Sequence, residues 1–402
     1  MKPPLALVEI ATIVRGVSFG SDDSISTPQP GYVPILRAGN IQQELILDHD
    51  LAWVPGKFVG AEQLLRRNDI VMCTSSGSIN VLGKSGIVEE QWSGSFGAFC
   101  VTVRANDLIC NPRYLFHFLR SDLFRAWTRR SSGANIKNIR KSELESFKIT
   151  LPSLPEQRRI ATILDKADAI RRKRRQAIDL MNDFLRSVFL EMFGDPDANP
   201  HHYPEPELRE LLEAIDSGKS PVCLSRKAEA EEWGVLKLSA VTGCNYRSDE
   251  NKALPPEEIP NPLNEVQTGD ILFARKNTYE LVGDCAFVWN TRPKLLLPDL
   301  IFRLKLRHDA PIIPLYLWGL LTSPTMRNRI QKLAGGTAGS MPNISKSRLE
   351  GLRIPLPSLE IQKQFATILQ KANNTKMQLA ESVSKSNELF TSVSNQLMGG
   401  SN

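Results

Sequence analysis

Residues 154–164 read Leu-Pro-Glu-Gln-Arg-Arg-Ile-Ala-Thr-Ile-Leu, and this stretch decides the fold. Pro155 suits the first turn of a helix, and Glu156 complements the positive end of the helix dipole. Apolar residues then recur at intervals of three and four as far as Val188, and Gly194-Asp-Pro196 ends the pattern. The spacing predicts a helix of roughly forty residues and about 60 Å, longer than most globular helices.

The same signal occurs a second time in the chain. Residues 149–154 read Ile-Thr-Leu-Pro-Ser-Leu, and residues 354–359 read Ile-Pro-Leu-Pro-Ser-Leu. The Ile-Ala-Thr-Ile-Leu of residues 160–164 returns as Phe-Ala-Thr-Ile-Leu at 365–369. The chain is therefore an internal duplication with a second long helix, and it divides into a domain at 1–150, a first long helix at 151–196, a domain at 197–353 and a second long helix at 354–402.

Each long helix carries a narrow apolar face, which favours packing against another helix in an antiparallel, coiled-coil-like pair. The predicted seam, or surface for a partner subunit, consists of Ile160, Ile163, Ile170, Arg174, Met181, Phe184 and Val188 from the first helix, and Phe365, Ile368, Leu379, Leu389 and Val393 from the second. In heptad register Arg174 occupies a core position. An alternative is that each helix caps only its own domain, although both helices run far beyond what one domain would cover.

Composition places the chain among ordinary globular proteins. It has 402 residues, of which 41% are hydrophobic and 23% charged, and its formal net charge of +6 is compatible with nucleic acid without being diagnostic. The six cysteines show no Cys-x-x-Cys spacing, so they suggest neither a zinc site nor a disulfide framework, and a reducing cytoplasm fits. The sequence has no run of eighteen apolar residues and no secretion leader, so we expect a cytoplasmic protein without membrane contact.

The two segments outside the long helices read as copies of one mixed α/β domain. In the first, apolar runs at 33–36, 69–72 and 99–103 lie between turn residues, as strands do, and Asn111-Pro112 begins a helix as its N-cap and first residue. The second segment keeps this plan with diverged residues, so the predicted fold class is α+β, with two similar domains, two long antiparallel helices and an internal pseudo-twofold duplication. Its loops differ most: residues 73–80 read Cys-Thr-Ser-Ser-Gly-Ser-Ile-Asn, and residues 274–280 read Ala-Arg-Lys-Asn-Thr-Tyr-Glu. Two related sites of different specificity follow from one scaffold with two sets of loops.

Three enzyme-like patterns fail on closer reading. The Asn-Pro-Arg-Tyr of residues 111–114 resembles the Asn-Pro-Pro-Tyr of DNA methyltransferases, but no Gly-rich cofactor loop follows an early strand. Gly218-Lys-Ser220 lacks the earlier glycine of a phosphate-binding loop, and His201-His202 has no third metal ligand nearby. We therefore expect no catalytic residue, no metal and no cofactor on this chain.

The order of these parts resembles the specificity subunit of a type I restriction-modification system. The resemblance covers essentially the whole chain and rests on the Leu-Pro-x-Leu-x-x-Gln start of both long helices, at 151–157 and 356–362, with the Asn-Pro-x-Tyr-Leu start at 111–115. It implies a non-catalytic subunit whose two target-recognition domains each read half of a bipartite, asymmetric site in double-stranded DNA, while the helices set the distance between the halves. It also implies two methyltransferase subunits, which methylate adenines with S-adenosylmethionine, and restriction/translocase subunits that use ATP and Mg²⁺.

The candidate DNA-reading residues carry hydrogen-bond donors or acceptors and lie in predicted loops. They are Arg15, Arg37, Asn40, Ser75, Ser76, Ser78 and Asn80 in the first domain, and Lys219, Lys237, Arg275, Lys276, Asn277 and Tyr279 in the second. The basic run Arg171–Arg175 has three open roles: contact with the DNA backbone, contact with a partner subunit, or a solvated helix face. Two other functions also stay open, namely a duplicated coiled-coil scaffold without DNA binding and a diverged, self-sufficient DNA methyltransferase or nuclease.

Overall fold

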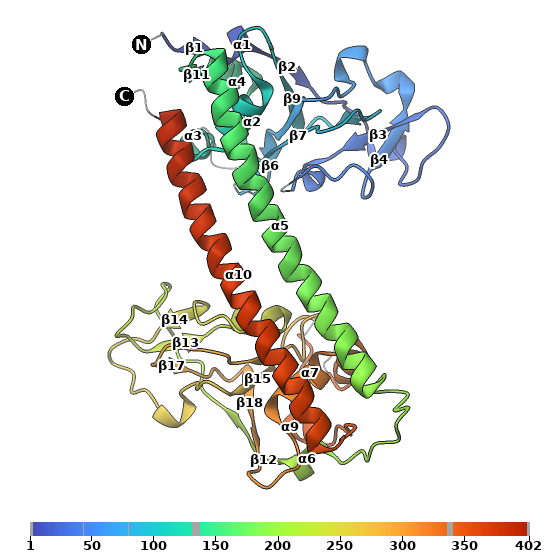
Figure 1. Cartoon of the computed structure of the whole chain (residues 1–402), viewed down its shortest axis with the longest axis vertical. Helices are drawn as coiled ribbons and strands as arrows, with labels where there is room; N and C mark the ends of the chain where they lie inside the picture. Colours follow the sequence, from blue (N-terminus) through green and yellow to red (C-terminus); the bar gives the residue numbers. More distant parts are fainter. Residues whose placement is uncertain (1–2, 43, 79, 131–136, 336–340, 400–402) are drawn as a thin grey trace. The chain divides into compact units, whose positions relative to one another are not determined.

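A computed structural model describes residues 3–42, 44–78, 80–130, 137–335 and 341–399 of the chain (Figure 1). Two compact units divide it. The first contains Met1–Gln176 and Leu379–Asn402, and the second contains Ala177–Gln378. Each long helix therefore contributes one half to each unit, and the units are described one at a time.

The first unit is built on two small sheets. Its strands are β1 (Leu5–Ala6), β2 (Ala11–Arg15), β3 (Tyr32–Leu36), β4 (Ala52–Pro55), β5 (Ile70–Cys73), β6 (Ser75–Ser76), β7 (Ser85–Ile87), β8 (Ser95–Phe96), β9 (Cys100–Ala105), β10 (Lys137–Asn138) and β11 (Lys148–Ile149). An antiparallel sheet has the order β2-β9-β5-β7, a smaller one has the order β4-β3-β8, and two further pairs are β1-β11 and β10-β6. The strands predicted near 33–36, 69–72 and 99–103 are confirmed as β3, β5 and β9.

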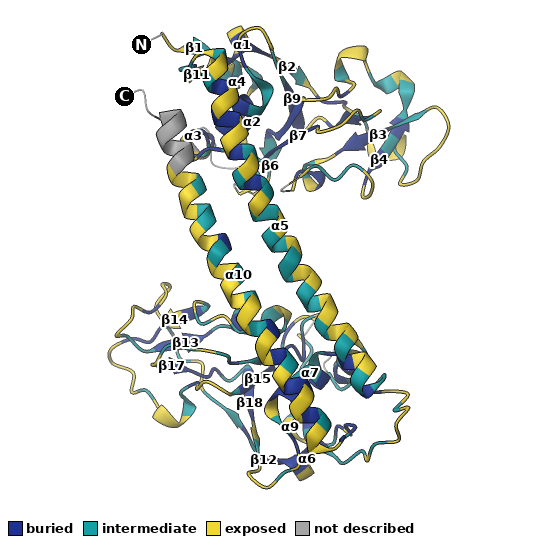
Figure 2. Ribbon diagram, viewed as in Figure 1, coloured by how far each residue is buried: buried dark blue, intermediate teal, exposed yellow. Residues whose placement is uncertain are grey.

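Short α-helices accompany these strands, namely α1 (Leu7–Ile10), α2 (Pro112–Arg120), α3 (Asp122–Arg130) and α4 (Lys141–Ser146). The predicted cap of α2 is confirmed, because the Oδ1 atom of Asn111 accepts a hydrogen bond from the backbone N–H of Tyr114 at 3.0 Å. A hydrophobic core forms where α2 and α3 meet the four-stranded sheet (Figure 2). It includes Tyr114, Leu115 and Phe124.

The second unit repeats this plan in its two main sheets. Its elements are α6 (Leu208–Leu211), β12 (Leu212–Ser217), β13 (Gly234–Leu236), β14 (Asn251–Ala253), β15 (Ile271–Ala274), β16 (Cys285–Phe287), β17 (Leu295–Leu296), β18 (Ile301–Leu306), α7 (Pro314–Thr322), α8 (Pro324–Lys332) and α9 (Lys346–Glu350). The sheet orders β12-β18-β15-β16 and β14-β13-β17 match those of the first unit position by position. The predicted internal duplication is therefore confirmed at the level of strand order.

Two glycines show how closely the copies agree. A side chain on Gly16 would place its Cβ 2.1 Å from the carbonyl oxygen of Gly97, and one on Gly218 would place it 1.7 Å from the carbonyl oxygen of Leu297. Both positions follow the first strand of the four-stranded sheet, where two backbones approach too closely for any side chain. The sequence therefore keeps a glycine at this position in both domains.

The long helices extend as predicted. Helix α5 runs over Leu154–Phe193 with 40 residues, and α10 runs over Leu359–Gly399 with 41. Each has a buried glutamine in its first turn. The Oε1 atom of Gln157 accepts from the backbone N–H of Asn111 at 2.8 Å, and the Oε1 atom of Gln362 accepts from the N–H of Ile313 at 2.8 Å. Each Nε2 atom donates to one carbonyl group just before α2 or α7 and to another just before the long helix itself. The Leu-Pro-x-Leu-x-x-Gln motif therefore attaches each long helix to the start of α2 or α7.

The two long helices pack together in both units. In the first unit the ring of Phe390, from α10, lies 6.0 Å from that of His117 and 4.5 Å from the guanidinium of Arg171. In the second unit Phe365, near the start of α10, lies 5.5 Å from Phe189, near the end of α5. Because the end of α10 meets the first half of α5 and its start meets the second half, the pair is antiparallel, as predicted.

The predicted seam is partly wrong. Ile163, Ile170, Phe184 and Leu389 are exposed by 38%, 49%, 52% and 65%, so they do not form an apolar seam in this chain. Ile160 and Phe365 are buried, whereas Met181, Val188, Ile368 and Leu379 are half-buried, and the side chain of Val393 lies outside the described residues. A single heptad register fails here because each helix half packs against its own domain as well as against the other helix, and because 3.6 residues per turn drift relative to a seven-residue repeat.

Arg174 does face the other helix, as its predicted core position requires. Its Nη1 atom donates to the carbonyl oxygen of Ser382 at 3.1 Å and also to the hydroxyl of Ser386. Glu381, the acidic residue beside Ser382, pairs with Lys385 of its own helix at 2.6 Å. Hydrogen bonds to oxygens of α10 therefore satisfy Arg174 without a carboxylate.

Candidate nucleic-acid interface

The loop between β5 and β7 carries four of the candidate residues of the first unit. Strand β6 places Ser75 and Ser76 beside β10, and the backbone N–H of Ile139 donates to the carbonyl oxygen of Thr74 at 2.8 Å. Ser78 and Asn80 are exposed in the same loop. The structure therefore brings Ser75, Ser76, Ser78 and Asn80 together on one short, polar segment.

An arginine from α3 is hydrogen-bonded to the backbone of this loop. Arg125 donates from Nη1 to the carbonyl oxygen of Leu82 at 2.5 Å and from Nη2 to that of Asn80 at 3.1 Å. Burial, followed by the charge of Arg129, lowers the pKa of Arg125 below its usual value. The guanidinium thus fixes the loop by its backbone and leaves the serine side chains free of this contact.

The other candidates of the first unit lie elsewhere on it. Arg15 is exposed at the end of β2, and Arg37 is exposed while its Nη2 atom donates to the carbonyl oxygen of Asp50 at 2.9 Å. Asn40 is only 2% exposed, and its amide bonds to the backbone of Arg37, His49 and Asp50. The structure therefore gives Asn40 a structural role, and a base contact by this residue has no support.

The matching loop of the second unit, between β15 and β16, contains Arg275, Lys276, Asn277 and Tyr279. The N–H of Ile344 donates to the carbonyl oxygen of Arg275 at 2.8 Å, as Ile139 does to Thr74 in the first unit. Arg327 repeats the role of Arg125, donating to the carbonyl oxygens of Val282 and Glu280, both at 3.0 Å. The two loops therefore share their supports and differ in their side chains.

Within this second loop the candidates differ in availability. Tyr279 is 55% exposed and Lys276 is half-buried, whereas Asn277 is only 6% exposed and its Oδ1 atom accepts from the N–H of Thr278. The Nε atom of Arg275 donates to Asn343 at 3.1 Å, and its guanidinium lies 5.1 Å from the ring of Phe302. Lys276 and Tyr279 are thus better placed to meet a ligand than their two neighbours.

The last two candidates lie outside this loop. Lys219 is exposed directly after Gly218. Lys237 is half-buried, and its ammonium forms an ion pair with Glu250 at 2.6 Å, which neutralises its charge. Neither residue is placed beside Tyr279 by any contact of the described residues.

Phe99 is a further candidate for DNA contact that the sequence pattern does not indicate. Its side chain is 68% exposed, and its carbonyl oxygen accepts from the backbone N–H of Thr74 at 2.9 Å and of Ser75 at 3.2 Å. An exposed aromatic ring beside a polar recognition loop is suited to stacking on a base. The apolar run at 99–103 predicts a strand that includes Phe99, but β9 starts one residue later, at Cys100.

The basic run Arg171–Arg175 is partly neutralised within the first unit. Asp168, only 8% exposed, lies 3.7 Å from Arg120, 3.7 Å from Arg171 and 3.9 Å from Arg172. Arg172 also pairs with Glu44. Two carboxylates, those of Asp168 and Glu44, face three guanidinium groups, so this region keeps an excess of positive charge.

Among the described residues no group of three His, Cys, Asp or Glu side chains is arranged to hold a metal ion, and all six cysteines are unpaired thiols. Within the same residues no helix is both long and apolar enough to cross a bilayer.

Comparison with known proteins identifies relatives of the whole arrangement. Residues 5–180 and 259–389 match the family described as the type I restriction modification DNA specificity domain. The chain is 28% identical over 405 residues to the EcoKI specificity subunit of Escherichia coli K12, covering 96% of this chain and 85% of that one. It is 35% identical over 184 residues to the StySPI specificity subunit of Salmonella potsdam, which spans 44% of this chain and 40% of the relative.

Solved structures share the fold at lower identity. The S subunit of a type I restriction-modification system from M. genitalium superposes with a TM-score of 0.57 at 13% identity, covering 98% of this chain and 96% of that one. A chain from a structure of the assembly and conformational transition of a type I system gives a TM-score of 0.51 at 18% identity, with coverage of 98% and 97%. These likenesses establish the same fold from end to end.

Proposed function

Because this chain belongs to the type I restriction-modification DNA specificity family, we propose that it reads a bipartite, asymmetric site in double-stranded DNA, one half with each unit. The specificity subunits to which it is similar are named as parts of type I restriction enzymes. In this proposal the chain supplies recognition, and partner subunits supply methylation and cleavage.

The observation that carries the proposal is the pair of loops at 74–83 and 275–283. Both are anchored by an arginine from the same helix position, Arg125 or Arg327, and both lie against the same backbone partner, Ile139 or Ile344. The scaffold repeats while the loop side chains change from serines to Lys276 and Tyr279. Shared supports with different side chains fit two readers of two different half-sites.

The chemistry of the loops suits the two kinds of DNA contact. Hydroxyl groups of Ser75, Ser76 and Ser78 donate to phosphate oxygens or to base edges, and Lys276 offers a positive charge to phosphate or guanine. Phe99 and Tyr279 add an exposed aromatic ring to each loop region, suited to base or thymine-methyl contact. Direct readout by these few side chains would discriminate each half-site independently.

The long helices supply the surface for partner subunits in this proposal. Ile163, Ile170 and Phe184 on α5 and Leu389 on α10 are large, apolar and exposed, although their spacing predicts that they face the other helix. Exposed apolar residues at helical spacing are typical of a surface that a partner covers. Methyltransferase subunits that bind here would bring S-adenosylmethionine to the DNA, and restriction subunits would bring ATP and Mg²⁺.

The test is a reconstitution with three arms. The full chain with its cognate methyltransferase subunits should methylate adenines at a split DNA motif, whereas the chain alone and the methyltransferase subunits alone should not. Methyl transfer by the purified chain alone would instead establish a self-sufficient methyltransferase. In a gel-shift assay, equal binding of random and target duplexes by the reconstituted complex would favour a scaffold that does not recognise a DNA sequence.

A further inference from the structure

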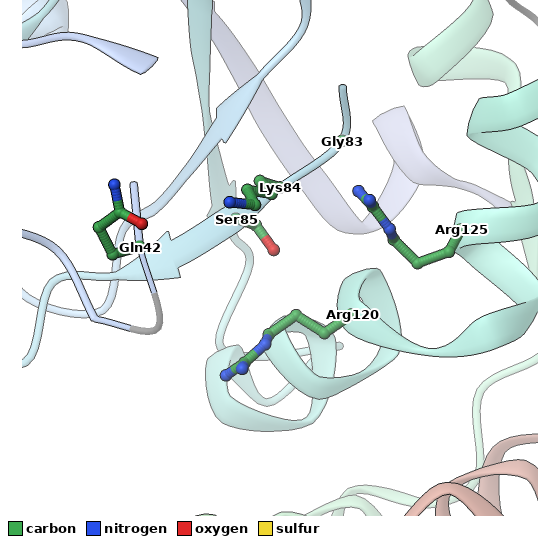
Figure 3. A pocket seen from close by; sticks show the side chains of 6 residues that line it. All are labelled: Gln42, Gly83, Lys84, Ser85, Arg120 and Arg125. Carbon is green, nitrogen blue, oxygen red and sulfur yellow. The ribbon is translucent and has the colours of Figure 1, made fainter. Parts of the chain in front are cut away.

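An open hollow of about 400 Å³ lies in the first unit beside the loop 74–83 (Figure 3). It is lined by Gln42, Gly83, Lys84, Ser85, Arg120 and Arg125. Three of these six residues are cations, and no carboxylate is among the described residues that line it. The hollow therefore has a strongly positive wall.

One buried hydroxyl in this hollow has no hydrogen-bond partner among the described residues. Ser85 is 4% exposed, and its Oγ atom makes no hydrogen bond within the described chain. In Figure 3 this oxygen faces the side of the hollow on which Arg120 and Arg125 lie. A buried hydroxyl without a partner costs about 1 to 3 kcal/mol, so a ligand that accepts its hydrogen bond would recover part of that free energy.

Arg120 is also incompletely satisfied. Its Nη1 atom is buried without a hydrogen bond to any described atom, and its nearest carboxylate, Asp168 at 3.7 Å, is shared with Arg171 and Arg172. The guanidinium is held in place 4.9 Å from the ring of Phe116. An ordered, under-neutralised guanidinium beside a free hydroxyl is well suited to an oxyanion.

The second unit shows what occupies the equivalent place in the duplicated domain. The N–H of Cys73 donates to the carbonyl oxygen of Lys84 at 2.9 Å, and the N–H of Ala274 donates to that of Asp284 at 2.8 Å, so Lys84 and Asp284 are equivalent. Helices α2 and α7 have nine residues each, so Arg120 corresponds to Thr322. At these two positions the first unit carries cations where the second carries a carboxylate and a hydroxyl.

In the second unit the carboxylate of Asp284 supplies the negative charge that pairs with the arginine. Asp284 is 3% exposed; its Oδ1 atom lies 2.6 Å from Nη2 of Arg327, and its Oδ2 atom accepts from the N–H of Gly243 at 2.7 Å. The arginine of the first unit, Arg125, has no such partner among the described residues, because Lys84 stands where Asp284 does. The internal copy thus marks an anion position that the first unit leaves for an external group.

We propose that the hollow lined by Lys84, Ser85, Arg120 and Arg125 binds a phosphate group, and that Asp284 takes the place of this group in the second unit. The DNA backbone is the favoured source, because Arg125 connects the hollow to Asn80 in the loop 74–83, and in this respect the proposal rests on the proposed function. Lys84 and Arg120 supply charge, and Ser85 donates a hydrogen bond to a phosphate oxygen. Free phosphate has the same chemistry and is the second source.

The first arm of the test uses inorganic phosphate and the full-length chain. At matched ionic strength, phosphate should raise the unfolding midpoint of the wild type above its value in chloride, and Lys84→Gln should abolish the gain. Ser85→Ala should weaken it without lowering the midpoint in chloride, because the hydroxyl has no partner to lose. Lys148→Gln removes an exposed lysine of the same unit and should keep the full gain.

A second variant at Lys84 distinguishes loss of the phosphate site from misfolding. Lys84→Asp recreates the arrangement of the second unit, so it should fold and pair internally with Arg125 while losing the response to phosphate. An equal phosphate effect in the wild type, Lys84→Gln and Lys84→Asp would overturn the site.

The second arm measures duplex DNA binding across a salt series. If the site holds a backbone phosphate, Lys84→Gln should weaken binding to all sequences and reduce the slope of log K against log salt by about one, and Lys148→Gln should not. A response to inorganic phosphate with unchanged DNA slopes would assign the site to free phosphate. Absence of DNA binding by the wild type would count against the proposed function, while the phosphate arm would still decide the site.

Discussion

The side-chain oxygen of Gln157 accepts a hydrogen bond from the backbone N–H of Asn111 at 2.8 Å, so a residue in the first turn of the long helix also fixes the start of α2. Gln362 makes the same bond to Ile313 in the second unit. Both glutamines are buried, with exposed fractions of 1% and 0%. The repeated Leu-Pro-x-Leu-x-x-Gln motif is thus a joint between each domain and its spacer helix.

Loss of either joint should destabilise the unit that contains it. Gln157→Ala leaves the N–H of Asn111 and the carbonyl oxygens of Ile109 and Pro152 without their partner, and a decrease of about 1 to 3 kcal/mol in the free energy of unfolding is expected. Gln176→Ala, at an exposed glutamine of the same helix, is the matched control. Urea denaturation checks both, and equal effects of the two substitutions would show that the joint contributes nothing.

Asp165 should make stability depend on acid pH. Burial by itself raises the pKa of this carboxyl, but hydrogen bonds from His117 at 2.7 Å and Arg113 at 2.8 Å outweigh it, and the net pKa lies below the ordinary value. A lowered pKa stabilises the fold above the unfolded value of about 4, and that stability disappears as pH falls through the folded pKa.

The measurement is the free energy of unfolding from about pH 5 down to about pH 3. Asp165→Asn should lower the stability at neutral pH and flatten the acid dependence, because the titrating group is gone. Asp183→Asn, at an exposed position of the same helix, should leave the curve nearly unchanged. If Asp165→Asn leaves the slope intact, the acid dependence belongs to other carboxyl groups.

Arg174 should hold the last part of α10 against α5. Its Nη1 atom bonds to the carbonyl oxygen of Ser382 and the hydroxyl of Ser386. Arg174→Ala removes both bonds and should speed amide hydrogen exchange over residues 379–392, whereas Lys173→Ala, at an exposed neighbouring position, should not. Unchanged exchange in Arg174→Ala would show that other interactions hold this segment.

The sequence predicts the long helices and the duplication because their signals are local and repeated. Capping residues, helical spacing and the two copies of Leu-Pro-x-Leu-x-x-Gln all lie within short windows. The exposure of Ile163 and Leu389 is not predictable in this way, since one helix has two packing partners and a heptad pattern describes only one. The local signal specifies where a helix begins and ends better than it specifies which face is covered.

The sites are harder to predict because they depend on contacts between distant residues. Asn40 has a side chain that could bind adenine, yet its amide group is hydrogen-bonded to the backbone of Arg37 and His49. The hollow combines Gln42, Ser85 and Arg120, which lie on different elements. Nothing in the spacing of these residues indicates that they meet. Their proposed role in binding an anion is inferred from the equivalent position of Asp284 in the second unit.

Sequencing of methylated adenines in cells that carry variants of this chain tests the central claim, that each unit reads its own half of a split site. Lys276→Ala with Tyr279→Ala should change or abolish recognition of one half and leave the other half unchanged, because removing a strong base contact costs about 1 to 3 kcal/mol of discrimination. Ser76→Ala with Ser78→Ala should affect only the opposite half. A split motif whose halves respond separately is the predicted result; halves that shift together, or a motif that ignores both pairs of substitutions, would contradict it.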